Sequence, residues 1–73
     1  MNRAPTASEL AKTVAIFNAT VSKGDAVIVT LDSRETKQTV TRSEAFILGG
    51  HSAMVMLEGI SGAYAVERVQ KVY

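Results

Sequence analysis

The sequence predicts an α+β fold, in which one N-terminal helix packs on a bent antiparallel sheet or a small open barrel of four to five strands. The hydrophobic period changes from about 3.6 residues before Gly24 to about 2 residues after Asp25. Glycine-rich turn signals then divide the rest of the chain into short β-branched runs. The 73 residues leave room for one small domain, residues 1–73, with a helix near residues 7–22 and strands within about residues 25–73.

The helix is predicted by a start signal, an apolar stripe and a stop signal. Thr6 and Glu9 have the spacing of a capping box, in which each side chain accepts a hydrogen bond from the backbone amide of the other residue. Apolar residues then recur at helical spacing and form one stripe that must be buried: Leu10, Val14, Phe17 and Val21. Gly24 follows the stripe, and Lys23 would lie in the last turn, so we expect the helix to end near Ser22.

The strand-rich part begins with a run of β-branched residues. Ala26–Leu31 is too short and too branched for a helix, and polar turn residues bound it on both sides. Thr36–Arg42 alternates as a more polar second strand, and Glu44–Leu48 continues it after a bend at Ser43. We therefore expect a strongly bent second strand.

Two glycine turns separate the remaining strands. Gly49-Gly50-His51-Ser52 contains paired glycines, which reach the positive φ values that tight hairpins need. Gly59-Ile60-Ser61-Gly62 is the second turn, and it lies between the predicted strands Ala53–Glu58 and Ala63–Val72. The last segment also permits a helical interpretation, so strand and helix both remain open for it.

A domain of this size is expected to need burial beyond its own core. It contains no cysteine and therefore no disulfide. Ala26–Leu31 and Ala53–Leu57 are apolar on both alternating faces, and a strand of this kind is covered on both faces. One helix stripe covers only part of one side, so we predict self-association into a homo-oligomer. The alternative is a monomer whose barrel buries these residues internally.

Three apolar residues are predicted to contact another copy. Ile16 points away from the helix stripe, and Met54 and Met56 form the second face of their strand. Methionine tolerates the irregular packing of an interface as well as that of a core. In the alternative arrangement, Met54 and Met56 lie under the helix and Ile16 is a single exposed apolar residue.

The order of one helix followed by short strands, with a bent second strand, is similar in outline to small SH3-like and Sm-like barrels. Ser33-Arg34-Glu35 replaces the glycine that often follows the first Sm strand. The Lys-His pair typical of bacterial Sm-like proteins is missing. The resemblance implies a barrel-like fold, and these departures argue against an RNA-binding ring.

Nucleic-acid binding is the second functional interpretation. Cations on or beside the second and last strands could line a phosphate track: Arg34, Lys37, Arg42, Arg68 and Lys71. Tyr64 and Tyr73 remain as stacking platforms, because Phe17 and Phe46 are predicted to lie in the core. The predicted binding residues are thus Arg34, Lys37, Arg42, Tyr64 and Arg68. A net charge of +1 gives little long-range attraction, so we rank nucleic acid behind a protein or small ligand.

The sequence offers no complete catalytic, metal or cofactor motif. Gly50–Met54 resembles the Gly-x-Ser-x-Gly elbow of hydrolases, but Met54 replaces its last glycine and His51 adjoins Ser52 in the same turn. We therefore expect no metal and no cofactor. Catalysis within one chain is disfavoured, and a site assembled between subunits remains an alternative.

The sequence predicts no membrane association. No apolar run reaches the roughly 18 residues of a membrane span, and the N-terminus lacks a secretory pattern, so we expect a cytoplasmic protein. The function predicted is that of a small homo-oligomeric interaction module. It would recognise a protein or small ligand through an apolar or strand-edge surface.

Overall fold

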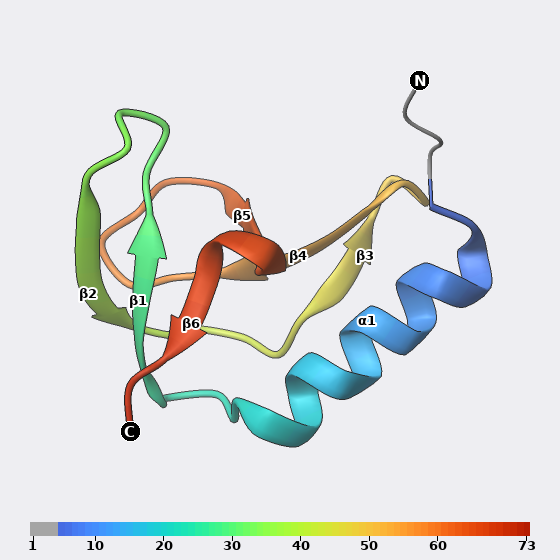
Figure 1. Cartoon of the computed structure of the whole chain (residues 1–73), viewed down its shortest axis with the longest axis horizontal. Helices are drawn as coiled ribbons and strands as arrows, with labels where there is room; N and C mark the ends of the chain where they lie inside the picture. The colour runs from blue at the N-terminus through green and yellow to red at the C-terminus, as the bar shows by residue number, and fades with distance from the viewer. Residues whose placement is uncertain (1–4) are drawn as a thin grey trace.

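The computed structural model describes residues 5–73 and combines one α-helix with two antiparallel sheets (Figure 1). The sheets have the strand orders β2–β1–β6 and β3–β4–β5. This arrangement confirms the α+β class. Neither sheet closes on itself within residues 5–73, so a closed barrel is not observed. The elements are α1 (Ala7–Thr20), β1 (Ala26–Thr30), β2 (Thr36–Val40), β3 (Phe46–Leu48), β4 (Ser52–Met56), β5 (Ala63–Ala65), the 3₁₀ turn η1 (Val66–Arg68) and β6 (Val69–Lys71).

The helix begins as predicted. The backbone N–H of Glu9 donates to Thr6 Oγ1 at 3.2 Å, and the backbone N–H of Thr6 donates to Glu9 Oε1 at 2.8 Å. The two bonds confirm the capping box, which satisfies amides that the first helical turn leaves free.

The helix ends earlier than predicted, at Thr20. Val21 has an extended backbone, and a turn follows in which the N–H of Asp25 donates to the carbonyl of Ser22 at 3.0 Å. The positive φ of Gly24, 93°, belongs to this turn. Lys23 therefore lies outside the last helical turn, which contains no basic residue.

The apolar stripe of α1 lies against the sheets. Leu10 is buried, and Val14 and Phe17 are partly buried against the core. Val21, which follows the last helical residue, is also buried. The helix packs on β3 and β4 (Figure 1). The centre of the core consists of four fully buried side chains on the inner faces of the strands: Val27, Val29, Val55 and Leu57.

A narrow connection joins the two sheets. Thr41 forms an isolated antiparallel bridge with Leu57, and the N–H of Arg42 donates to the carbonyl of Met56 at 2.8 Å. The chain then leaves the strand conformation until Phe46. The interruption falls where the sequence predicts a bend, and it divides the expected second strand between β2 and β3.

The final segment is neither one strand nor one helix. Ala63–Ala65 pairs with β4, Val66–Arg68 forms the 3₁₀ turn, and Val69–Lys71 pairs with β1. The turn lets the chain change from one sheet to the other, so the single extended segment predicted for Ala63–Val72 becomes two short strands. The described chain accordingly contains six strands instead of four to five.

Candidate functional site

The register of the β3–β4–β5 sheet gives its two faces different chemistry. Directly opposed residues of antiparallel strands point to the same face, so Phe46, Met54 and Ala65 share one face. Val55 and Tyr64 share the other. Val55 is fully buried and Tyr64 packs against the core, so their face is the inner one. The face that carries Met54 therefore points away from the core.

This outward side carries apolar residues at nearly all of its paired positions and is here called the apolar sheet face. Leu48 is 50% exposed, and the other members are half-buried. None of the members is charged, and Ser52 is the one polar residue at the paired positions of this side. Apolar surface of this kind on a small domain marks an interaction site more often than isolated exposed residues do. The members are Phe46, Leu48, Met54, Met56, Ala63 and Ala65.

Phe46 corrects one expectation, because it belongs to this face and not to the core. The residue before it, Ala45, is the buried one. Asn18 of α1 holds Ala45 through two hydrogen bonds, receiving one from the Ala45 N–H at 2.8 Å and donating one to the Ala45 carbonyl at 3.2 Å. This contact sets which residues of β3 point inward. The side-chain alternation of β2 does not continue across the bend, so it cannot predict the orientation of β3.

The three predicted interface residues lie on two different surfaces. Met54 and Met56 are on the apolar sheet face, so they do not lie under the helix. Ile16 is 59% exposed on α1 and lines a separate cleft. Contact of any of these residues with a second copy stays a prediction.

Two of the predicted binding residues border the apolar sheet face. Tyr64 and Arg68 line a hollow of about 220 Å³ together with Met54 and Asp32. Arg68 Nη1 lies 3.3 Å from Asp32 Oδ1 and donates to the carbonyl of Leu31 at 3.4 Å. The guanidinium is therefore already paired, although both side chains remain partly exposed.

The other predicted cations lie away from this hollow. Arg42 Nε donates to the carbonyl of Leu57 at 3.2 Å and lies 4.0 Å from Glu58 Oε2. The Lys37 ammonium lies beside Gly59. Arg34 is in the turn between β1 and β2, with a φ of 72°. Two of the five predicted binding residues, Arg42 and Arg68, thus have carboxylate partners that reduce the positive charge they offer to a phosphate.

Lys71 joins the end of the β2–β1–β6 sheet to the helix. Its Nζ donates to the carbonyl of Thr20 at 2.9 Å, lies 3.4 Å from Asp25 Oδ2 and is 5.6 Å from the centre of the Tyr73 ring. The backbone N–H of Ser22 donates to Asp25 Oδ2 at 2.8 Å. This hydrogen bond lowers the pKa of Asp25, and Lys71 lowers it further against an opposing desolvation effect.

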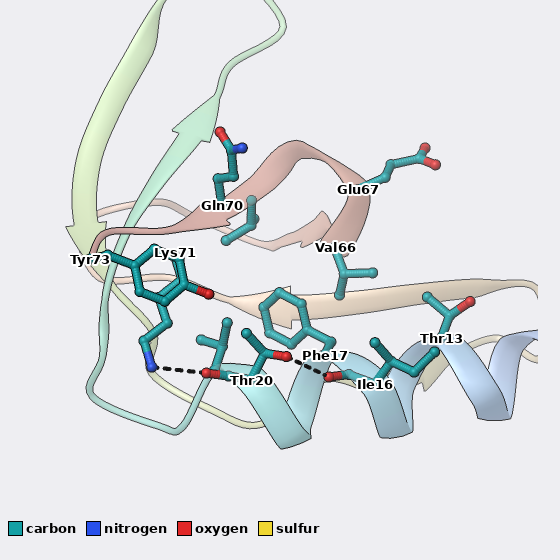
Figure 2. Close-up of a pocket in the computed structure, with 11 residues that line it drawn as sticks. Thr13, Ile16, Phe17, Thr20, Val66, Glu67, Gln70, Lys71 and Tyr73 are labelled. Atoms are coloured by element: carbon teal, nitrogen blue, oxygen red, sulfur yellow. Dashed lines mark hydrogen bonds between the residues drawn. The ribbon is translucent and has the colours of Figure 1, made fainter.

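A second candidate surface is a cleft of about 560 Å³ between α1 on one side and η1 with β6 on the other, here called the helix cleft (Figure 2). Figure 2 shows Phe17 rising from α1 toward Val66 and β6. No sequence pattern indicated this cleft, because its walls come from distant parts of the chain. It is lined by Thr13, Ile16, Phe17, Thr20, Val21, Val66, Glu67, Val69, Gln70, Lys71 and Tyr73.

The structure places the hydrolase-like turn next to Glu67 but does not form a triad. His51, Ser52 and Glu67 line one cavity of about 350 Å³. Among residues 5–73, no hydrogen bond joins any two of these three side chains. The described residues also contain no group of three or more His, Asp or Glu side chains arranged to hold a metal ion.

Comparisons with protein-family models, with curated proteins and with solved structures find no match for this chain. No helix within residues 5–73 is both long enough and apolar enough to span a bilayer. The candidate functional surfaces are therefore the apolar sheet face and the helix cleft.

Proposed function

We propose that this chain is a small homo-oligomeric interaction module, in which a second copy packs on the apolar sheet face. The main support is that the outward side of the β3–β4–β5 sheet has apolar residues at nearly all of its paired positions and no charged residue. Antiparallel sheets that face water carry polar residues on that side, and a sheet that is apolar on both faces is normally covered on both. A second copy supplies an apolar surface of the same shape, as two-fold dimers require.

The size of the chain argues that the interface extends beyond these six side chains. A stable interface buries about 800 Å² per partner, which is roughly a sixth of the 5008 Å² surface of this chain. β3 and β5 are the edge strands of their sheet, so they present unpaired backbone groups beside the apolar sheet face. The proposed interface therefore combines this face with one of these strand edges.

The Thr41–Leu57 bridge joins the two sheets, and this connection favours an open SH3-like or Sm-like barrel as the unit that associates. We propose a cytoplasmic location and a protein or small ligand as the molecule recognised by the assembled module. Nucleic acid ranks behind these partners, because Arg42 and Arg68 each have a carboxylate partner.

The proposal is tested by Met56→Glu, which places a charge in the apolar sheet face. We expect light scattering after size-exclusion chromatography to give a dimer or larger species at micromolar concentration, and Met56→Glu to give a monomer. Burial of an unpaired charge costs several kcal/mol, so the loss of assembly should be complete at that concentration. Circular dichroism should show that the variant stays folded.

Ile28→Glu is the matched control. Ile28 is 38% exposed on the outer side of the other sheet, opposite Gln38 and Gln70, so the same substitution there should leave the oligomer intact. A folded wild-type monomer at high concentration would contradict the proposal.

A further inference from the structure

We propose that the helix cleft binds an extended apolar peptide segment carrying a lysine or arginine, and that this segment adds to the free edge of β6. The site is separate from the proposed oligomer surface, because Met54 and Met56 do not line it.

The shape of the site fits an extended chain. The helix cleft shares Thr13, Val66 and Glu67 with the neighbouring cavity that reaches Pro5 and His51. The two hollows together therefore follow α1 along its length. A helix of 14 residues is about 21 Å long, which matches about six residues of β-strand.

The backbone of β6 provides one wall with unpaired hydrogen-bonding groups. β6 is an edge strand, and the N–H of Val72 donates to the carbonyl of Ala26 at 3.0 Å. Successive residues of an antiparallel strand direct their backbone groups to opposite edges. The N–H and C=O groups of Val69 and Lys71 therefore point away from β1. The N–H of Val69 already donates to the carbonyl of Val66, so the C=O of Val69 and both groups of Lys71 are left for an added strand. An added peptide strand would pair with these groups, as in other domains that bind peptides at a sheet edge.

The side chains around the cleft select an apolar peptide. Phe17, Val66 and Val69 form apolar walls, and Ile16 adds a side chain that is 59% exposed. Alternate residues of a bound strand point to one side, so every second side chain of the peptide could be buried against these walls.

The charges in the cleft favour a cation. The positive charge of Lys71 is offset by Asp25 and by the carbonyl of Thr20. The carboxylate of Glu67, in contrast, has no hydrogen bond or ion pair with any residue of 5–73. Glu67 lines both hollows, and Figure 2 shows its side chain extending from η1 away from α1, so its carboxylate lies at the rim of the combined groove. An exposed ion pair contributes little affinity, but it fixes the position and sign of the charge that fits best.

The test measures fluorescence anisotropy of a labelled heptapeptide titrated with the full chain. The peptide alternates valine and threonine and has lysine in place of its central threonine. We expect saturable binding, which Glu67→Lys weakens about tenfold, while the same variant gains affinity for a matched peptide with glutamate at the centre. Glu67→Gln should lose the preference between the two peptides.

Glu44→Lys is the control, because Glu44 is exposed outside both hollows and the net charge changes equally. Equal weakening by Glu44→Lys would overturn the proposal, since general charge would then explain the effect.

Two further peptides test the strand pairing. One carries N-methyl groups on its odd-numbered backbone amides and the other on its even-numbered amides. Because only one set can face β6, we expect one peptide to lose binding and the other to retain it. Full binding by both would overturn pairing at the β6 edge. The proposal would also be overturned if the wild-type chain does not bind the peptide and Glu67→Lys dissociates the oligomer. These two results together would show that a second copy occupies the cleft.

Discussion

The outer face of the β2–β1–β6 sheet mixes apolar and polar residues, whereas the outer face of the β3–β4–β5 sheet is almost entirely apolar. In the first sheet, Ile28 lies between Gln38 and Gln70, and Thr30 lies opposite Thr36. In the second, the equivalent positions form the apolar sheet face. Both sheets bury their inner faces in one core, so the core does not explain the difference. The difference supports the proposal that a second copy covers the outer face of the β3–β4–β5 sheet.

The largest expected effect on stability distinguishes the inward-facing Leu57, which follows β4, from the outward-facing Met56 at the end of β4. Leu57 is fully buried, and Leu57→Ala should lower the free energy of unfolding by about 2–5 kcal/mol through lost burial and a cavity. Met56→Ala, on the outer side, should cost about 1 kcal/mol in the monomer. Urea unfolding at several protein concentrations measures both. Only the Met56 effect should grow with concentration, and the comparison fails if the two effects grow alike.

A smaller effect is expected from the polar contact that attaches the β3–β4–β5 sheet to the helix. Asn18→Ala removes both hydrogen bonds to Ala45 and leaves partly buried backbone groups unpaired, at a cost of about 1–3 kcal/mol. Amide hydrogen exchange at Ala45 should accelerate. Thr20→Ala is the control, because its hydroxyl donates only to Ile16 of the same helix. If the two substitutions cost the same, the helix is held by its apolar stripe alone.

The β2–β1–β6 sheet has its own polar attachment, and this one depends on pH. The hydrogen bond from Ser22 and the ammonium of Lys71 hold the pKa of Asp25 below its ordinary value of 3.8. A depressed pKa gives stability that is fully present above the unfolded-state value and is lost as pH falls through the folded-state value. We expect the unfolding midpoint of the wild-type chain to decrease when the pH is lowered below about 4. The midpoint of Asp25→Asn should decrease less over the same pH range. Parallel curves for the two proteins would show that Asp25 has no such role.

The smallest expected effect concerns the turn between β1 and β2. Arg34 has a φ of 72°, a left-handed conformation that costs a residue with a side chain about 1–2 kcal/mol. Arg34→Gly relieves this strain but makes the unfolded chain more flexible, so the net change should stay within about 1 kcal/mol. Arg34→Val should be clearly less stable. Thermal unfolding compares the two, and greater stability of the valine variant would contradict the assigned backbone conformation.

The sequence predicted the elements that local signals control. The capping box at Thr6 and the stripe from Leu10 to Val21 predicted α1. A short run of β-branched residues between polar turns predicted β1. These signals lie within a few residues of the structure they cause, so no tertiary information is needed to use them.

The remaining features depend on contacts between distant residues. The burial of Ala45 instead of Phe46 follows from a hydrogen-bonded contact with Asn18, which the local pattern does not contain. The 3₁₀ turn at Val66–Arg68 follows from the change of sheet between β5 and β6. The helix cleft exists only because β6 returns beside α1, so its residues have no shared signal in the sequence.

The pairing of β6 with β1 has a consequence for the order of folding. β1 and β2 are joined by a short turn, whereas β6 reaches β1 only after all the other elements have been passed. Closing the longer loop costs more entropy, so we expect β6 to dock last and to detach first in local opening. A molecule that bridges β6 and α1 would hold this late element in place. Its occupancy of the cleft would therefore lengthen the lifetime of the native state of the whole chain.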